Sequence, residues 1–273
     1  KGYRIPGGYE FLSSDAIELA LNPSSRQVIS PLHVERVTDS TNQRLLDLIG
    51  ESEIHGVVWL AEYQTRGRGR RGGSWLAPPG SGLCLSLGWR FDTPPSSISA
   101  LSLVVGIAVV RALHRLGGAN LQLKWPNDVY HAERKLAGIL IEMRSEFGGP
   151  CEVAIGIGLN VALSPDAHAR IDEIATDASS ACGFVPSRNT AAASILDELV
   201  SVLQDFSTAG FDAYRSEWKQ HDYLADRRIR VEMPGRMVRG VARGVAEDGT
   251  LLVEHDGTTE AFLSGHIVME GEH

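Results

Sequence analysis

The sequence predicts an α+β fold, in which a central sheet of apolar strands is flanked by helices and followed by a small all-β unit. Apolar runs of strand length recur along the chain, at residues 57–61, 83–89, 121–125, 136–143 and 153–159. Segments with helical periodicity lie between and after these runs. From Arg228 onward, short β-branched runs alternate with pairs of turn residues that are typical of hairpins. A chain of 273 residues is long enough for one large domain or two unequal ones.

The first elements are short. Residues 14–21 are expected to form a helix capped by Ser13 or Ser14, and residues 22–25 to form a turn or linker. A short strand is expected at residues 34–37.

The next helix is expected to begin at Ser40 and Thr41 and to stop at Gly50, because leucines follow at helical spacing. The backbone N–H groups at such a helix start have no partner within the helix. They can donate hydrogen bonds to a capping side chain or to a ligand. The continuous apolar run at 57–61 is typical of a buried strand, and it leads directly into a loop rich in arginine and glycine.

The middle of the chain supplies the core. Residues 83–89 alternate with a period of two, and residues 99–116 form a helix that is apolar on most sides. The strand at 121–125 is stopped by Pro126, and the last two strands of the sheet are expected to be joined by a polar turn at 147–150.

Two amphipathic helices are expected before the all-β unit, at residues 191–206 with Thr190 as the cap and at residues 211–221. The all-β unit is punctuated by the turn pairs Pro234-Gly235, Asp248-Gly249 and Asp256-Gly257.

Composition narrows the class of protein. With 26 basic and 34 acidic residues the net charge is -8, so the chain as a whole should repel nucleic acid. The three cysteines, Cys84, Cys151 and Cys182, are far apart, which argues against a disulfide framework or a structural zinc site. No signal peptide is visible, and the most apolar run, at 101–110, is too short to span a bilayer. We therefore expect a cytoplasmic protein with no membrane partner.

The most unusual stretch is the arginine loop, residues 66–75, in which four arginines and four glycines precede Ser74 and Trp75. Glycine disfavours regular structure, and arginine is suited to bidentate contacts with carboxylate or phosphate. Three interpretations fit the loop alone: a solvated basic loop, a nucleic-acid contact, or a cradle for a small anion. The acidic body of the chain favours the small anion over a long polyanion.

Further polar groups stand at the ends of predicted strands: Asn127 and Asp128, Lys135, and Asn160. Polar loops on a rigid sheet are the common arrangement of a functional site.

The order of the motifs is specific. It runs Asp-Ser-Thr-Asn at 39–42, Glu-Tyr-Gln at 62–64, the arginine loop, Lys-Trp-Pro-Asn-Asp at 124–128, Lys-Leu-Ala-Gly-Ile-Leu at 135–140 and Gly-Ile-Gly-Leu-Asn at 156–160. This order resembles the biotin–protein ligase family, in particular its bacterial ligase/biotin-operon-repressor branch. The resemblance covers nearly the whole chain and is weakest at 164–186.

The resemblance implies a mixed central sheet like that of class II aminoacyl-tRNA synthetases, with biotin and ATP bound in a catalytic domain at 29–223 and an SH3-like β-barrel at 224–273. The opening Lys1-Gly2-Tyr3 resembles the tail of the winged helix-turn-helix that precedes the ligase core in that branch, so residues 1–28 are expected to be the remnant of this domain and its linker. Operator binding and repression are then expected only of the parent protein. The family also implies a homodimer.

The implied reaction joins biotin and ATP into biotinyl-5′-AMP and then transfers biotin to a lysine of the biotin carboxyl carrier protein of acetyl-CoA carboxylase. The resemblance makes Lys135, Arg68 and Arg70 the catalytic cations, which bring the carboxylate and the α-phosphate together. The loop is expected to cover the intermediate and shield it from water.

The resemblance assigns two overlapping binding sets. Biotin is assigned Ser40, Thr41, Asn42, Gln64, Arg68, Gly69, Arg70, Lys135, Gly138 and Gly158. ATP is assigned Arg68, Arg70, Arg71, Trp75, Asn127, Asp128, Lys135 and Asn160, with Trp75 stacking on adenine and Asp128 holding Mg²⁺.

Three other interpretations compete with this one. A lipoate or octanoate ligase shares the catalytic fold, but the segment around Trp125 and Asn127 favours biotin. A biotin-sensing repressor without catalysis would not need an ATP-binding group such as Lys135. A nucleic-acid module built on the arginine loop would bind generic oligonucleotides with steep salt dependence.

Overall fold

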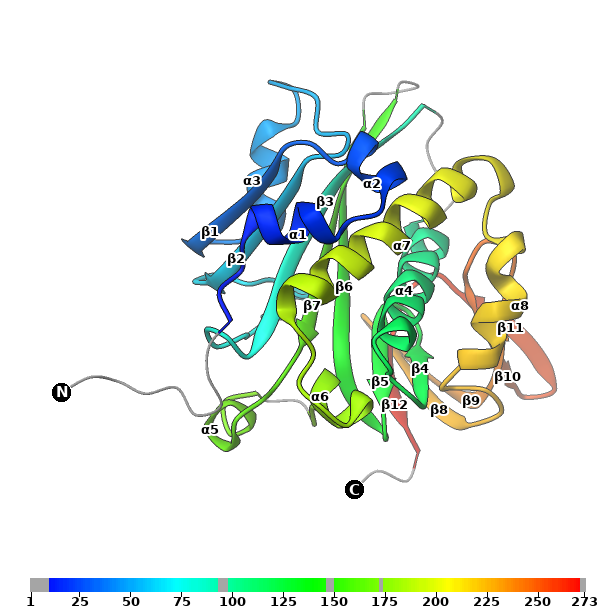
Figure 1. Cartoon of the computed structure of the whole chain (residues 1–273). Coiled ribbons are helices and arrows are strands. Elements are labelled where there is room, and N and C mark those ends of the chain that lie inside the picture. Colours follow the sequence, from blue (N-terminus) through cyan, green and yellow to red (C-terminus); the bar gives the residue numbers. More distant parts are fainter. Residues whose placement is uncertain (1–9, 93–97, 146–149, 172–173, 271–273) are drawn as a thin grey trace.

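The structure is a computed structural model that describes residues 10–92, 98–145, 150–171 and 174–270 (Figure 1). The described residues form a seven-stranded sheet with helices on both faces and a separate five-stranded antiparallel sheet near the C-terminus. This arrangement confirms the predicted α+β class and the all-β unit. The start of the chain, residues 1–9, and most of the predicted turn at 147–150 lie outside the described residues. None of the helices described is at once long enough and apolar enough to cross a bilayer.

The large sheet is mixed, as expected. Its strands lie in the order β1-β2-β3-β7-β6-β5-β4, and β1 and β2 are parallel while all other neighbours are antiparallel. The bounds are β1 Leu32–Thr38, β2 Val58–Gln64, β3 Gly82–Phe91, β4 Leu121–Lys124, β5 Asp128–His131, β6 Arg134–Ser145 and β7 Cys151–Asn160. Strand β5 was not predicted from the sequence, because its four residues include only Val129 and Tyr130 as typical strand formers.

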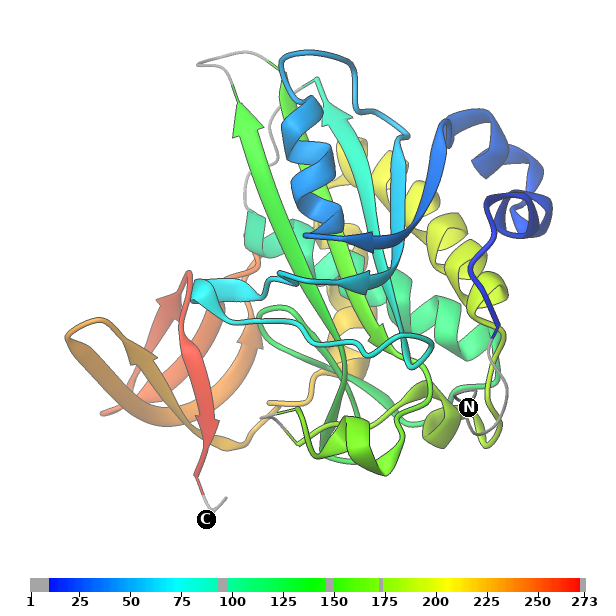
Figure 2. The ribbon, with the colours of Figure 1, turned by 90° about the vertical axis from the view of Figure 1, so that its left-hand side faces the viewer.

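The helices cover the sheet unequally. Helix α3 lies on one face, and the opposite face carries α4 and α7, onto which α1, α2 and α8 pack (Figure 2). The bounds are α1 Ser14–Ala20, α2 Pro23–Val28, α3 Thr41–Leu48, α4 Ile98–Arg115, α7 Arg188–Ala209 and α8 Asp212–His221. Helix α4 is the core helix that was predicted, since its described side chains from Leu103 to Val110 are buried. Two short helices, α5 (Pro165–His168) and α6 (Ala178–Cys182), follow β7.

Two local predictions were wrong. Residues 22–25 do not form a turn, because Asn22 accepts a hydrogen bond from Ser25 N and caps helix α2, with Pro23 in its first turn. Helix α7 begins before Thr190, because Ser187 is the cap and its hydroxyl accepts from Thr190 N at 3.1 Å. In contrast, Ser13 caps α1 as predicted.

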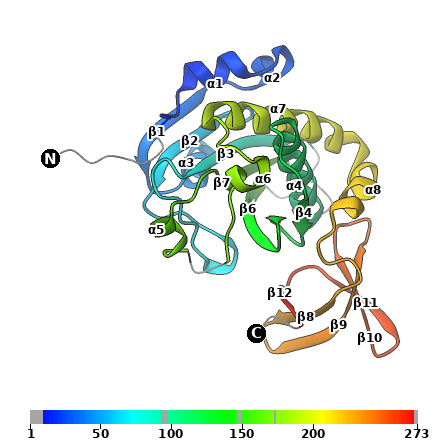
Figure 3. The same ribbon diagram turned by 60° about the horizontal axis from the view of Figure 1, so that its bottom comes forward.

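The C-terminal sheet has the strand order β11-β10-β9-β8-β12. Its bounds are β8 Arg228–Met233, β9 Arg236–Val245, β10 Leu251–His255, β11 Thr258–Phe262 and β12 His266–Met269. Asp256 and Gly257, with φ of 49° and 74°, form the predicted tight turn between β10 and β11. This sheet lies beside the β4 edge of the large sheet and below α8 (Figure 3). The buried Trp125 joins the two units, since its Nε1 donates to Gly249 O at 2.9 Å.

Candidate functional site

The floor of the site is a row of residues on one face of the large sheet. Residues that pair directly across neighbouring strands share a face, and the register places five of them in one row from β3 to β4: Cys84, Gly158, Gly138, Asp128 and Lys124. A second row on the same face, two residues further along each strand, contains Ser86, Gly156 and Leu140. Three of the residues in these two rows are glycines, which have no side chain. Other elements can therefore pack directly on the backbone at the centre of the sheet.

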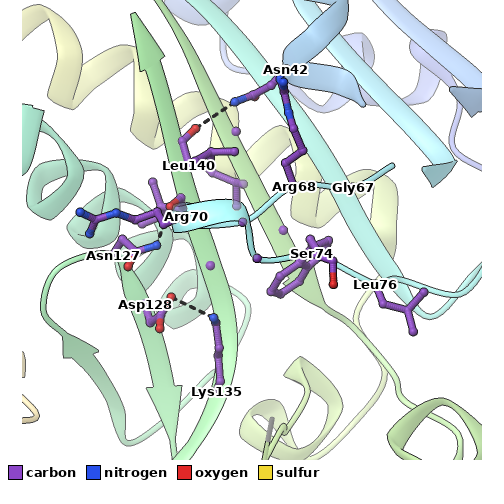
Figure 4. Close-up of a pocket in the computed structure, with 18 of the residues that line it drawn as sticks. Asn42, Gly67, Arg68, Arg70, Ser74, Leu76, Asn127, Asp128, Lys135 and Leu140 are labelled. Atoms are coloured by element: carbon purple, nitrogen blue, oxygen red, sulfur yellow. Dashed lines mark hydrogen bonds and ion pairs between the residues drawn. The ribbon is translucent and has the colours of Figure 1, made fainter. Parts of the chain in front are cut away.

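A cavity of about 760 Å³ opens over this floor. Its walls come from the start of α3, the end of β2, the arginine loop, β5 and β6 (Figure 4). Every residue that the sequence assigned to biotin, ATP or metal lines it: Ser40, Thr41, Asn42, Gln64, Arg68, Gly69, Arg70, Arg71, Trp75, Asn127, Asp128, Lys135, Gly138, Gly158 and Asn160. The structure therefore brings the predicted residues together, while their individual roles remain predictions.

The start of α3 is held in place by Gln64. The Oε1 atom of Gln64 accepts from Thr41 N at 2.7 Å and from Thr41 Oγ1 at 3.1 Å. This carboxamide satisfies one of the free N–H groups at the helix start, which Ser40 as N-cap does not do with its own side chain. Below it, the hydroxyl of Ser86 lies 2.7 Å from Thr41 Oγ1, to which it can donate.

Asn42 is fixed on all sides. Its Nδ2 donates to Leu140 O at 3.1 Å and to Glu142 Oε2 at 2.9 Å, and Ser86 Oγ lies 2.6 Å from its Oδ1. A Cβ on Gly156 would come within 2.4 Å of Oδ1, so the side chain lies directly on the β7 backbone. Both N–H groups of the amide are thus engaged by the protein, which also fixes which end of the amide is nitrogen.

The arginine loop returns on itself as a narrow hairpin. Trp75 N donates to Gly67 O at 3.0 Å and Gly69 N to Gly73 O at 2.7 Å, and a single 3-10 turn, η1 (Arg70–Gly72), lies at the tip. Figure 2 shows this tip reaching toward β12 of the C-terminal sheet. Gly265 and Ile267, at the near end of β12, line the same cavity.

The two arginines predicted to be catalytic point to different sides of the cavity (Figure 4). Arg68 extends toward α3, where Nη1 donates to Gln43 Oε1 at 2.9 Å and Nη2 to Glu142 Oε2 at 2.8 Å. Arg70 extends toward Asn127. Burial, and then the neighbouring charge of Arg71, lower the pKa of Arg70, whereas the charge of Asp128 raises it. An incoming anion would compensate the cost of burying this guanidinium.

Lys135 and Asp128 face each other at the β5–β6 hairpin, with Nζ 3.2 Å from Oδ1. Nζ also lies 5.9 Å from the centre of the Trp75 ring. The ammonium group is therefore in the cavity, between a carboxylate and the indole. The neighbouring Asn127 is held by the backbone, since its Nδ2 donates to Ile139 O at 2.7 Å.

The indole of Trp75 lies on the glycines of the floor. A Cβ on Gly158 would come within 2.2 Å of its Cε2 atom, and a Cβ on Gly138 within 3.2 Å of its Cζ3 atom. The glycines that were assigned to biotin therefore make room first for Trp75. Beneath the indole lies Cys84, whose thiol pKa is raised to about 12 by burial, so it remains neutral.

Residues 174–176 run beside Lys135, and Ala175 among them lines the cavity. Lys135 N donates to Ile174 O at 3.0 Å, and Thr176 N donates to Lys135 O at 2.9 Å. Asn160 Nδ2 donates to Thr176 O at 3.0 Å, while Asn160 Oδ1 has no partner among the residues that the structure describes. The amide nitrogen of Asn160 is thus engaged by the backbone, and its Oδ1 atom remains as an acceptor beside the cavity.

Across the described ranges, no three His, Cys, Asp or Glu side chains are grouped to hold a metal ion by themselves. Asp128 is the carboxylate on the floor row of the cavity. A single carboxylate suits Mg²⁺ that arrives with a nucleotide, because this ion takes most of its other ligands from phosphates and water. The donor set therefore fits a metal brought by the substrate.

Sequence reasoning missed two residues that shape the site, Ser86 and Glu142. Both face the cavity side of the sheet through their register with β7, and both hold Asn42. The available signal was a polar residue inside an otherwise apolar strand, since Glu142 follows the run from Leu136 to Ile141.

Comparisons with known proteins point the same way. The Biotin/lipoate A/B protein ligase family matches residues 34–160, and the Biotin protein ligase C terminal domain matches residues 225–269. The bifunctional ligase/repressor BirA of Escherichia coli is 36% identical over 271 residues, which cover 98% of this chain and 81% of that protein. The biotin–[acetyl-CoA-carboxylase] ligase of Mycobacterium tuberculosis is 36% identical over 243 residues, with 87% and 88% covered.

A solved structure is also similar. The biotin protein ligase from Aquifex aeolicus in complex with biotin and ATP superposes with a TM-score of 0.74 at 26% identity, covering 89% of this chain and 99% of that one.

Proposed function

The chain belongs to the biotin protein ligase family, and on this premise we propose that it forms biotinyl-5′-AMP from biotin and ATP and transfers biotin to a protein lysine. One observation supports the assignment of this reaction to the cavity. The polar start of α3 lies at one side of a single cavity, and Lys135, Asp128, Asn127 and Trp75 lie at the other. A vitamin carboxylate and a nucleotide can therefore meet above the glycine floor.

The first step joins two anions. A biotin carboxylate oxygen bonds to the α-phosphorus, the bond from that phosphorus to the bridging oxygen breaks, and pyrophosphate leaves with the electron pair. Lys135 stabilises the charge that builds up on the phosphorus oxygens, and Arg70 supports it from the loop. Thr41 and Gln64 hold the ring end of biotin, so that the carboxylate is held in line with the phosphate.

Mg²⁺ bound through Asp128 and the ATP phosphates would supply Lewis-acid charge on the leaving group. Trp75 presents an aromatic face for adenine beside Lys135. The side chain of Asn127 is anchored to the backbone, which gives it a defined position next to Asp128.

In the second step, a lysine amine of the acceptor attacks the acyl carbon of the mixed anhydride, and AMP leaves. The carrier proposed is the biotin carboxyl carrier protein of acetyl-CoA carboxylase, because the related enzyme of Mycobacterium tuberculosis is named for that substrate. Biotin is preferred to lipoate because the match to the Biotin protein ligase C terminal domain adds to the shared catalytic family.

The proposal also covers repression by the parent protein, the location of the enzyme in the cell and its oligomeric state. The bifunctional relatives support a parent protein that also represses transcription through an N-terminal DNA-binding segment. We place the enzyme in the cytoplasm, where its carrier and ATP are found, and we assign it a homodimeric state.

The decisive test is direct. The purified protein is incubated with biotin and Mg·ATP, and the protein-bound fraction is analysed by mass spectrometry. Biotinyl-5′-AMP is expected in the complete mixture and not when ATP or biotin is omitted. A folded protein that bound biotin but formed no adenylate would instead support a biotin-sensing protein without catalysis.

A further inference from the structure

Glu142 is a partly buried carboxylate at the edge of the site, on β6, and the reaction described above does not use it. Its side chain is 27% exposed. A single oxygen, Oε2, accepts from two directions: from Asn42 Nδ2 at 2.9 Å and from Arg68 Nη2 at 2.8 Å. The first donor belongs to the start of α3 and the second to the arginine loop, which are separate elements of the site.

We propose that Glu142 is a positioning residue that couples the biotin-binding start of α3 to the arginine loop, so that the two walls form together. The inference rests on the proposed function, because it assigns biotin to the α3 side of the cavity. It also gives Arg68 a role distinct from that of Arg70 and Lys135: Arg68 anchors the loop, and the other two cations face the reacting groups.

The geometry at Asn42 gives the first argument. Asn42 is 3% exposed, and its amide is held between Leu140 O, Ser86 and the backbone of Gly156. It has no room to turn toward another acceptor. Without the Glu142 carboxylate, one buried N–H of this amide would lose its partner, which is costly for a buried group. Thr41, the neighbouring residue that we assign to biotin, would then lose part of its support.

The geometry at Arg68 gives the second argument. Its guanidinium donates to Glu142 and to Gln43 of α3, and it does not extend toward Lys135 (Figure 4). A charge-assisted hydrogen bond is stronger than a neutral one, so Glu142 is the main anchor of this side chain. The backbone bridge between Arg68 and Ser74 passes this restraint to the returning strand of the loop, which ends at Trp75.

The coupling predicts that biotin binding at α3 changes the accessibility of the arginine loop, which can be measured. Biotin bound at the start of α3 adds contacts to the wall that holds Asn42 and Glu142, which further restrains the carboxylate that accepts from Arg68. Biotin alone, without ATP, should therefore protect the arginine loop. The loop offers an internal probe, because trypsin cleaves after arginine and the loop contains four arginines between residues 66 and 71.

The experiment compares wild-type protein with Glu142→Ala and Glu142→Gln, using Glu152→Ala as the matched control. Glu152 lies on the neighbouring strand β7, opposite Arg90 and Arg144 and away from the loop. Biotin and ATP dissociation constants are measured by calorimetry, loop cleavage by limited trypsin digestion, and folding by thermal unfolding.

For Glu142→Ala, the biotin dissociation constant should rise roughly tenfold or more, because the buried amide of Asn42 would lose a charged hydrogen-bond acceptor. The ATP dissociation constant should change less than about twofold, and saturating biotin should no longer protect the loop. Glu142→Gln should show the same pattern with smaller changes, because it keeps an oxygen and loses the charge. Glu152→Ala should match the wild type. In the double variant Arg68→Met/Glu142→Ala, the loss of biotin affinity should be smaller than the sum of the two single losses, because the bond between Arg68 and Glu142 is shared by both changes.

The inference would be overturned if Glu142→Ala bound biotin as the wild type does, or if biotin still protected its loop. Equal losses of biotin and ATP affinity together with a lower unfolding temperature would also overturn it, since they would indicate a merely structural role. If Glu142→Ala does not fold, Glu142→Gln decides by the same criteria. A wild-type protein that bound no biotin would overturn the proposed function itself, and that result is distinguished by the absence of any biotin signal before a variant is compared.

Discussion

The Nζ atom of Lys135 lies 3.2 Å from Oδ1 of Asp128, and the two side chains are only 17% and 18% exposed. The pair places a cation and an anion side by side in the cavity that we assign to ATP. The cation can meet the α-phosphate, and the carboxylate can hold the metal that accompanies the phosphates.

Lys135→Ala should abolish adenylate formation without unfolding the protein. We expect biotin-dependent pyrophosphate exchange to fall by roughly 10²–10³-fold, the cost typical of losing one group that stabilises charge in a transition state. Lys219→Ala, an exposed change on α8, serves as the control and should leave the exchange rate unaltered. An unchanged rate in Lys135→Ala would remove Lys135 from the catalytic groups.

Gly158→Ala should displace Trp75 from the floor. The added Cβ would overlap the indole, since it would lie 2.2 Å from Cε2. Calorimetry should show weaker ATP binding by about tenfold, comparable to the loss of one aromatic stacking partner. In a Trp75→Ala background the same glycine change should weaken ATP little further. A full additional loss there would show that Gly158 contacts ATP directly.

Glu62→Gln should destabilise the fold. Glu62 and Arg188 form a buried pair at 2.8 Å, with side chains 7% and 4% exposed, and Glu62 also accepts from Leu12 N. Leaving one buried charge without its partner costs about 3–5 kcal/mol, which urea denaturation can measure. Glu260→Gln, which breaks an exposed pair with Arg236, should have little effect. If Glu62→Gln and Glu260→Gln lowered the free energy of unfolding equally, the buried pair of Glu62 and Arg188 would not contribute more to stability than an exposed pair.

Asp222→Asn should make the protein more stable near neutral pH. Burial, together with the charge of Asp226, raises the pKa of Asp222 from 3.8 to about 6, although a hydrogen bond from Leu224 N opposes the shift. The folded state thus holds this proton more tightly than the unfolded state does. The contribution of Asp222 to stability is therefore greatest below about pH 4 and is lost as the pH rises through about 6.

The measurement is the unfolding free energy of wild type and Asp222→Asn at several pH values. The variant should be more stable by roughly 1–3 kcal/mol at about pH 7.5, and the difference should shrink toward pH 4. Asparagine keeps the oxygen that accepts from Leu224, so the turn is preserved. A difference that did not change with pH would show that charge at this position is not the cause.

Much of the fold could be predicted from local patterns. The period-two alternation around Leu85, the apolar helix α4 and the turn at Asp256-Gly257 each depend on neighbours in the sequence, and the structure contains all three. Strand β5 was missed because it is short, and its pairing with β4 and β6 places it in the sheet. The cap of α7 was placed three residues too late, and the contacts of Glu10 with Ser187 and Arg188 at the start of this helix join positions about 177 residues apart, which local patterns do not reveal.

The candidate site, like the fold, was predicted in part. The motifs identified which residues line the cavity, because loops and strand ends carry recognisable residue types. The partners of these residues could not be predicted, since the Asn42–Glu142 contact joins positions 100 residues apart and the Arg68–Glu142 contact joins positions 74 apart. For the same reason, the glycine floor was assigned to the ligand alone, although Trp75 occupies it in the structure.

The indole N–H of Trp125 donates a hydrogen bond to Gly249 O, and residues at the start of β12 border the cavity. Both units of the chain thus contribute to the walls of one cavity, and moving the smaller unit away would leave the buried N–H of Trp125 without its acceptor. Gly265 and Ile267, more than a hundred positions downstream of Lys135, thus line the same cavity as that lysine. Tags or fusions at the C-terminal end should accordingly be judged by their effect on turnover, not only on solubility.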